Sequence, residues 1–402
     1  MEVWKRNLYI IWVAQFFAIG GISLVLPFLP LFIRELGVAS IEEERIWSGW
    51  AYAGPFLLSF LSTPIWGTLG DKYGRKIMTV RAIFGLGLTQ ILVGFSQNPF
   101  QLVLFRLIQG ILSGFIPAAL SLVSSNTPKE RSGYALGILQ TSTATGSIIG
   151  PLIGATLATF FGFRIIFFIN SATCIFIGFF IIWGFKEVST ASKEEKYHSI
   201  INNFKYVITK KHILVTLFIF FLAQTGVVSN SPIFTLFIES ITSNTTNLAT
   251  TAGIVFSIAG VANVIFAPIW GKKNDQQGAK RNLSLALFLG AISIGFHCMA
   301  TNVFIVSFLR IILGISIGGI LPALYLIMSN STPLERRGGV LGIASSFSTL
   351  GNMVGPLLGG YIASYYGFNF VFLFGALMLT LCGGIVLKGF LDPQTIKSNE
   401  IR

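Results

Sequence analysis

The chain has 402 residues, of which 53% are hydrophobic and 11% are charged, and its mean hydropathy is +0.75. Soluble globular proteins contain about 25% charged residues, so this composition excludes a soluble fold. The 38 phenylalanines and 43 glycines suit helices that present bulky side chains to lipid and approach one another closely at glycines. We therefore expect an integral membrane protein built from helices.

Apolar stretches of about 20 residues, the length that crosses the hydrocarbon core of a bilayer, recur along the whole chain. The first six are expected at 8–33, 47–69, 77–96, 100–124, 134–160 and 163–185, and the second six at 212–239, 247–271, 282–301, 303–328, 338–365 and 368–388. Twelve spans predict an all-α integral membrane fold in which both termini lie on the same side of the membrane.

The net charge of +13 follows the positions of the spans. With the N-terminus in the cytoplasm, all lysines and arginines fall on the cytoplasmic side except Arg34, Arg45 and Arg164 on the outer side and Arg106 and Arg310 within spans. This distribution is the positive-inside bias of membrane proteins. The basic charge therefore gives no reason to expect nucleic acid as a partner, and both termini are expected in the cytoplasm.

A shift of 204 or 205 positions lays the second half of the sequence over the first. The Pro64-Ile65-Trp66-Gly67 run recurs as Pro268-Ile269-Trp270-Gly271, Asp71 as Asp275, and Arg106 as Arg310. Copies separated by six spans keep the same orientation, which predicts two pseudo-symmetric six-helix bundles with a site between them. We expect the N-terminal bundle at 1–185, a cytoplasmic linker at 186–211 and the C-terminal bundle at 212–402.

The linker leaves two alternatives open. Its apolar residues recur at helical spacing opposite lysines, and they are Ile200, Ile201, Phe204, Val207 and Ile208. This pattern is typical of a helix that lies on the cytoplasmic membrane surface, where the partner would be membrane lipid. A flexible linker is the other alternative.

A ten-residue run between spans 2 and 3 combines glycines with charged residues. It contains Gly67, Thr68, Leu69, Gly70, Asp71, Lys72, Tyr73, Gly74, Arg75 and Lys76, and Arg81 follows at the cytoplasmic end of span 3. The run resembles the loop signature of the major facilitator superfamily. The second copy loses the Gly-Arg pair to Gly278-Ala279, so we assign the gating role to the first copy.

This resemblance implies that Asp71 faces the start of span 11, near Gly338 and Gly339, when the inner gate is shut. A carboxylate beside the free N–H groups of a helix N-terminus is stabilised by about 0.3 to 1 kcal/mol. Loss of that contact would bias the gate toward the open state. The alternative is a loop acid that balances charge and turn geometry.

Spans 5 and 11 carry matching glycine-proline motifs. The residues are Gly146, Gly150, Pro151 and Gly154 in span 5, and Gly351, Gly355, Pro356 and Gly359 in span 11. Both motifs resemble the antiporter signature of drug exporters. Glycines at four-residue spacing make a flat face, and a proline bends its helix, so we expect a hinge at the interface between the halves. The alternative is a packing motif common to helix bundles.

Two arginines fall inside spans, Arg106 in a stretch that resembles a further family signature and Arg310 at the equivalent place. A charge at the centre of a span costs at least ~2.5 kcal/mol, so each is expected to face a cavity and act in proton transfer or in recognition of substrate charge. Arg106 could instead extend toward the outer interface. No acid falls in a span interior, which leaves Glu35 and Glu239 as coupling candidates, or as ordinary interfacial acids.

Uncharged amides within spans need partners and point inward, which makes them candidates for lining a cavity. We name Gln15, Gln140, Gln224, Asn230 and Asn352 as cavity candidates. The sequence contains no metal-ligand cluster, nucleophile elbow or phosphate-binding loop, so we expect neither catalysis nor a bound metal or cofactor.

The runs Gly20-Gly21 and Pro27-Phe28-Leu29-Pro30 in span 1 resemble the first span of the twelve-span drug:proton antiporters. A resemblance to bacterial multidrug efflux transporters covers nearly the full length. It implies a monomeric secondary transporter of the bacterial cytoplasmic (inner) membrane that exports small amphipathic molecules in exchange for protons. A dedicated exporter of one metabolite, such as a siderophore, an importer or facilitator, and a membrane receptor are the alternatives.

Overall fold

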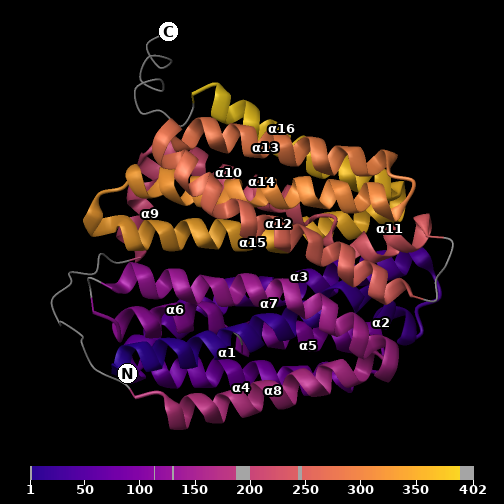
Figure 1. The fold of residues 1–402 in the computed structure, drawn as a ribbon, viewed down its shortest axis with the longest axis horizontal. Helices are drawn as coiled ribbons and strands as arrows, with labels where there is room; N and C mark the ends of the chain where they lie inside the picture. Colours follow the sequence, from indigo (N-terminus) through magenta and orange to yellow (C-terminus); the bar gives the residue numbers. More distant parts are fainter. Residues whose placement is uncertain (1, 113, 129–130, 187–199, 243–246, 390–402) are drawn as a thin grey trace. The chain divides into compact units, whose positions relative to one another are not determined.

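The computed structural model describes residues 2–112, 114–128, 131–186, 200–242 and 247–389, which form α-helices joined by short turns (Figure 1). The hydrocarbon core of a bilayer offers no hydrogen bonds, so a spanning segment has to pair its backbone groups internally, as a helix does. The expected all-α fold is confirmed.

The helices of the first half follow the six expected spans. Span 1 contains α1 (Val3–Val25), the 3-10 turn η1 (Leu26–Phe28) and α2 (Leu29–Glu35). Span 2 is α3 (Ile41–Tyr73) and span 3 is α4 (Arg75–Gly94). Span 4 consists of α5 (Pro99–Leu112) and α6 (Phe115–Ser125), span 5 is α7 (Ser132–Phe161) and span 6 is α8 (Phe163–Gly184). The expected order of elements is therefore present, although spans 1 and 4 are interrupted.

The second half repeats this order after a short helix, α9 (Ile200–Thr209). Its spans are α10 (Lys211–Val228) with η3 (Ser231–Ile233) and α11 (Phe234–Ile241), α12 (Leu248–Gln277), α13 (Ala279–Phe296) with η4 (His297–Met299), α14 (Val303–Asn330), α15 (Leu334–Tyr366) and α16 (Phe368–Leu387). Ten of the spans in the described part are long and apolar enough to cross a membrane by composition alone. The 33-residue helices α3 and α15 are the other two of the twelve.

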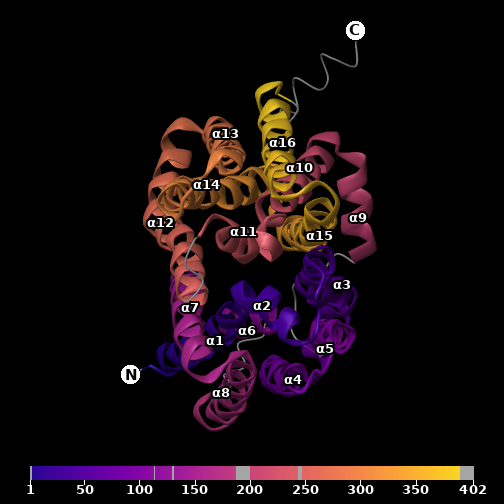
Figure 2. The ribbon, with the colours of Figure 1, turned by 90° about the vertical axis from the view of Figure 1, so that its right-hand side faces the viewer.

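The chain divides into two compact units. Unit 1 is Met1–Glu194 with Ser243–Ser257, and unit 2 is Glu195–Thr242 with Ile258–Arg402. Within each unit the long helices run alongside one another, as their nearly end-on view in Figure 2 shows. Unit 1 contains two buried apolar clusters, one that includes Ile11 and Ile83 and another that includes Leu29 and Phe167.

The short helix α9 packs against α10 and α15 of unit 2. Val207 is buried, whereas Phe204 and Ile208 on the other edge of the helix are exposed. Asn203 lies against Gly339 of α15 so closely that a Cβ at that glycine would overlap the Asn203 amide. Gly339 therefore has a packing role inside unit 2.

The glycine motif of each half packs against the first span of its own unit. Gly146, Gly150 and Gly154 of α7 face α1, and Gly351, Gly355 and Gly359 of α15 face α10 and the residue that follows it. Added Cβ atoms at Gly154 and Gly359 would overlap the carbonyl oxygens of Leu24 and Ser229, which occupy equivalent places in the repeat. The bare faces of these glycines are thus used for backbone contact within each bundle, and the expected hinge at the interface between the halves stays a prediction.

Substitution of Gly154 by alanine is expected to destabilise unit 1, because the new methyl group has to displace the backbone of α1. Overpacking of this kind costs about 1–3 kcal/mol. The measurement is the melting temperature of the purified chain in detergent by tryptophan fluorescence, which should fall by a few degrees. Gly137→Ala is the matched control, because nothing lies within 4 Å of a Cβ built there on the same helix. A similar melting temperature for both variants would contradict the packing role.

Candidate functional site

Span 1 is interrupted near its end by two prolines. Pro30 has no N–H with which to bond the Leu26 carbonyl in a regular α-helix, and the chain tightens into the 3-10 turn η1. The Tyr52 hydroxyl of α3 donates a hydrogen bond of 2.5 Å to the same Leu26 carbonyl. The equivalent proline of unit 2, Pro232, lies in η3. Both first spans thus end in a short helix set off by a turn.

Arg106 is buried between α5 and α3. Its Nε donates to the Ala51 carbonyl at 2.9 Å, and its Nη1 donates to the Gln109 amide oxygen at 3.0 Å. Pro55 lacks the N–H that would bond the Ala51 carbonyl within α3, so Arg106 supplies a donor at a position where the helix has none. With 3% of its surface exposed, Arg106 does not extend to the interface, and its described contacts hold two spans of unit 1 together.

The run expected as a loop between spans 2 and 3 is almost entirely helical. Gly67 and Gly70 lie inside α3, and the turn consists of Gly74 alone, whose φ of 103° is accessible to glycine. The backbone of Asp71 belongs to α3, but its side chain lies outside the described residues. The prediction of a multi-residue loop was wrong because a single left-handed glycine suffices to reverse the chain.

The basic residues that follow this turn bond carbonyls on three other helices. Arg75 Nη1 donates to Ser121 of α6 at 3.1 Å, Lys76 Nζ donates to Ile182 and Phe185 at the end of α8 at 2.9 and 2.8 Å, and Arg81 Nη1 donates to Leu112 of α5 at 3.1 Å. Cations are favourable at helix C-termini, where carbonyls lack partners. The basic residues of the motif therefore connect spans 4 and 6 to span 3 by hydrogen bonds.

Span 4 is discontinuous. Helix α5 ends at Leu112 and α6 begins at Phe115, with Gly114 between them at a φ of 100°. The break removes the helical partners of the last three α5 carbonyls, and each accepts a bond from another span. The donors are Ser62 Oγ to Gly110 at 3.1 Å, Trp66 Nε1 to Ile111 at 2.7 Å, and Arg81 Nη1 to Leu112 at 3.1 Å. The Arg81 guanidinium also stacks over the Trp66 ring, 3.5 Å from its centroid.

The equivalent helix of unit 2 is unbroken. α14 runs from Val303 to Asn330, although Trp270 Nε1 bonds the Ile315 carbonyl at 2.8 Å as Trp66 bonds Ile111. The places of Ser62 and Arg81 are taken by Phe266 and Leu285, which have no side-chain donors. The broken span therefore occurs in the half that has the donors to stabilise it.

A cavity of about 100 Å³ lies beside this break in unit 1. Trp66, Arg75, Met78 and Arg81 line it, together with Gly67 and Gly70 of the motif. Two guanidinium groups give the lining a basic character, and the volume accommodates several water molecules. The motif glycines, for which the sequence predicted a gate, thus border this partly open pocket.

Arg310 of unit 2 has surroundings unlike those of Arg106. It is 6% exposed, and its guanidinium lies 3.9 Å from the centroid of the Phe234 ring. His297 lies beside the same aromatic group, stacks on Phe372 with ring centroids 5.2 Å apart, and contacts the Ser293 carbonyl through Nδ1 at 2.8 Å. The structure therefore brings together two embedded basic residues that the sequence did not relate to each other.

The amides expected to line a cavity have different locations. Gln15 bonds Thr143 of α7 at 2.7 Å, and Gln224 bonds Asn352 at 2.8 Å, so each joins the first and fifth spans of its unit. Asn230 is buried and bonds the Val227 carbonyl, whereas Gln140 is exposed.

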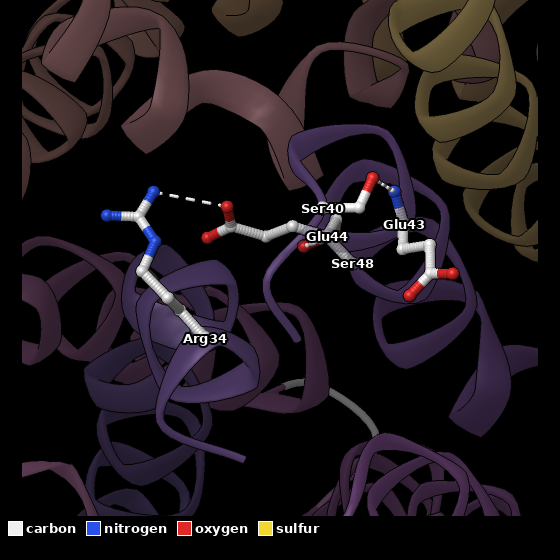
Figure 3. A network of polar contacts seen from close by, with 5 residues as sticks. All are labelled: Arg34, Ser40, Glu43, Glu44 and Ser48. Carbon is white, nitrogen blue, oxygen red and sulfur yellow. Dashed lines mark hydrogen bonds and ion pairs between the residues drawn. The ribbon is translucent and has the colours of Figure 1, made fainter. Parts of the chain in front are cut away.

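Among the carboxylates whose side chains are described, Glu44 is the buried one. Glu35 is exposed and Glu239 is half-buried, whereas Glu44 is 2% exposed and pairs with Arg34 at 3.1 Å (Figure 3). Glu44 was not among the expected site residues because it lies before residue 47, where span 2 was expected to begin. The pattern Ser40-x-x-Glu43 was the available signal, since it predicts a helix start and Ser40 caps α3.

Substitution of Arg81 by alanine is expected to loosen span 4 at its break. A hydrogen bond to a charged group contributes about 1.5–3 kcal/mol, so amide hydrogen exchange in segment 105–120 should accelerate about tenfold or more. Mass spectrometry of the exchanged chain is the measurement, with segment 309–324 of α14 as the internal reference. Arg281→Ala, which removes an exposed arginine of α13, is the matched control. Unchanged exchange in Arg81→Ala would refute the role of Arg81 at the break.

Comparison with known proteins places this geometry in a family. The family model of the Major Facilitator Superfamily matches residues 11–248 and again 233–401. Multidrug resistance protein MdtG of Proteus mirabilis is 36% identical over 381 residues, 93% of each chain, and that of Yersinia enterocolitica is 35% identical over 402 residues, 99% of this chain and 96% of the relative.

A solved structure shares the fold. It is a bacterial homolog to the human lysosomal transporter Spinster, in an inward-facing and occupied conformation, with a TM-score of 0.80, 13% identity, and coverage of 96% of this chain and 97% of that chain. The double match of the family model agrees with the internal repeat. The chain belongs to the Major Facilitator Superfamily and is a membrane transporter.

Proposed function

We propose that this chain is a secondary active transporter that exports small amphipathic compounds in exchange for protons, by alternating access. The observation that carries the proposal is the near-full-length likeness to relatives named multidrug resistance proteins. In transporters with parallel repeats, the halves move around a site near the middle of the membrane. The single chain supplies twelve spans, and we take the monomer as the transporting unit.

We place the chain in the bacterial cytoplasmic (inner) membrane with both termini in the cytoplasm. The distribution of lysines and arginines supports this orientation. On the proposed outer side, Arg34 pairs with Glu44 and Arg164 Nη1 donates to the Gly94 carbonyl at 3.0 Å.

We assign α9 to the cytoplasmic surface of the membrane, with lipid as its partner. The helix exposes Phe204 and Ile208, and Lys205 and Lys210 are exposed beside them. Exposed apolar side chains flanked by lysines suit the boundary between acyl chains and anionic headgroups. Its packing against α15 would keep the start of span 11 close to this surface.

The proposed substrates are anionic, zwitterionic or neutral amphipathic molecules. Arg106 and Arg310 are both buried, and the buried carboxylate Glu44 is paired with a third arginine. Because Arg106 donates to groups of its own unit, its charge would act on a substrate through the electrostatic potential and not by direct contact. A site with excess positive potential favours anions over dications.

Inside-out vesicles that contain the chain are expected to accumulate substrate when their lumen is acidified. The test compounds are an amphipathic anion, a zwitterion, a neutral amphiphile and a lipophilic cation. Their uptake reports the direction of transport, its coupling to protons and the charge preference, and vesicles lacking the chain are the control. Uptake that persists after the pH gradient is collapsed would contradict proton coupling. Transport of the cation alone would contradict the proposed charge preference, and loss of preloaded solute under the same gradient would indicate an importer.

An Asp71→Asn variant tests the proposed gate. If Asp71 stabilises the shut inner gate at the N-terminus of span 11, its neutralisation removes about 0.3–1 kcal/mol and should slow transport about two- to fivefold while the chain still folds. Initial rates in the vesicle assay and elution as a single species in detergent are the measurements. Asp275→Asn, at the equivalent place in the second half, is the matched control. Undiminished transport by Asp71→Asn would count against the gate.

A further inference from the structure

The ion pair between Arg34 and Glu44 joins the end of span 1 to the start of span 2. Arg34 Nη2 lies 3.1 Å from Glu44 Oε2, and the two side chains differ widely in exposure, 44% for Arg34 and 3% for Glu44. Figure 3 shows the two side chains reaching toward each other from α2 and α3. The Glu44 carboxylate is thus shielded from water, whereas the Arg34 guanidinium remains accessible to water.

The first turn of α3 explains why Glu44 alone is turned inward. Ser40 caps the helix by accepting a bond from the Glu43 N–H at 3.4 Å, and its hydroxyl donates to the Glu42 carboxylate at 2.7 Å. Glu42 and Glu43 are exposed, and the Glu43 side chain points away from Arg34 in Figure 3. Ser48 donates to the Glu44 backbone carbonyl at 2.7 Å, which helps to fix the backbone of this turn.

Charged groups around Glu44 come from the elements packed near it. On α3 itself Arg45 interacts electrostatically with Glu42 and Glu44, and on α2 Glu35 is adjacent to Arg34. From α8, Arg164 acts electrostatically on Glu35. From α5, Arg106 bonds α3 at Ala51, about two turns further along. Arg34 is in direct contact with the Glu44 carboxylate, through the hydrogen-bonded ion pair.

An ionised carboxylate in a buried position is strongly destabilised unless a cation accompanies it. If Arg34 moves away, the favourable response of Glu44 is to bind a proton and become neutral. The Arg34 side chain can leave the pair because it is 44% exposed, whereas the apolar side chains of α2 stay buried. The ion pair therefore links the position of the Arg34 side chain to the protonation of Glu44.

We propose that Glu44 is the outer proton-binding residue of the transport cycle and that Arg34 is the positioning residue that controls its protonation. This inference rests on the proposed proton-coupled function and orientation. A proton from the outer solution binds the Glu44 carboxylate, the ion pair opens, and the guanidinium stays charged in water. When Arg34 re-forms the pair in the inward-facing state, Glu44 releases its proton to water in the transport pathway, which is then open to the cytoplasm.

Infrared difference spectroscopy of the purified full-length chain tests this assignment without any substrate. On acidification, the wild type should show the carbonyl band of a protonated carboxyl group in an apolar environment, and Glu44→Gln should lose it. Glu43→Gln, which neutralises the exposed neighbour, is the matched control and should keep the band. A band of equal intensity in Glu44→Gln would overturn the assignment.

The role of Arg34 is tested by the pH at which the infrared carbonyl band of the protonated carboxyl group appears. Arg34→Gln removes the cation, so the band should appear at a pH higher by about one unit or more, because an opposite charge nearby favours the ionised form. Arg34→Lys restores the charge and should move the profile back toward the wild type. If neither variant shifts the profile, Arg34 has no positioning role. This pair also tests the proposal if Glu44→Gln fails to fold.

Transport assays distinguish a failure of this inference from a failure of the proposed function. With carboxyfluorescein as the probe in proteoliposomes, Glu44→Gln should lose at least tenfold in uptake driven by a pH gradient, but should retain exchange of labelled for unlabelled probe. Gradient-driven uptake equal to wild type would overturn the role of Glu44 while leaving the proposed function intact. If the wild type itself takes up no solute in response to the gradient, the proposed function fails, and the infrared result alone decides whether Glu44 binds the proton.

Discussion

The helices of this chain lie in a medium that offers no hydrogen bonds, so a backbone carbonyl that loses its helical partner requires a donor from elsewhere in the protein. Prolines and glycines create such carbonyls at defined places. Tyr52 bonds one near Pro30, and Arg106 bonds another that faces Pro55. Each of these contacts joins two spans, so the interruptions in single helices also become the polar connections between helices.

The same constraint explains the difference between the two halves. Span 4 is broken and α14 is not, although both carry a glycine at the place of Gly114. A break exposes consecutive carbonyls, and unit 1 has the extra donors Ser62 and Arg81 to bond them. The loop signature of the family therefore has a structural role here beyond its turn, because its basic residues terminate the helices of neighbouring spans.

Glycines set the distance between the spans that these polar bonds connect. The stripes on α7 and α15 bring backbones into contact with α1 and α10 just before the proline turns of the first spans. Beyond its turn in unit 1, α2 is joined to α3 by the Arg34–Glu44 pair. The apolar side chains of α2 are buried, so this ion pair is the polar contact at the end of a span that is otherwise fixed by packing.

The sequence alone determined the number of spans, the internal repeat and the family, because hydropathy and a 204-to-205-residue periodicity are properties of the chain itself. It also located the functional motifs, although their contacts depended on the fold. The glycine stripes pack on the first spans, a partner that the sequence did not specify, because spacing identifies a flat helix face but not the helix that packs on it.

The embedded charges show the same division. That Arg106 and Arg310 lie in spans followed from the sequence, whereas the Ala51 carbonyl and the Phe234 ring that they contact are more than 50 residues away in the chain. Glu44 is three residues before the expected start of span 2, and only its pairing with Arg34 across the turn shows that it is buried. Partners and burial were decided by the tertiary structure because both arise from the packing of separate helices, which no local pattern records.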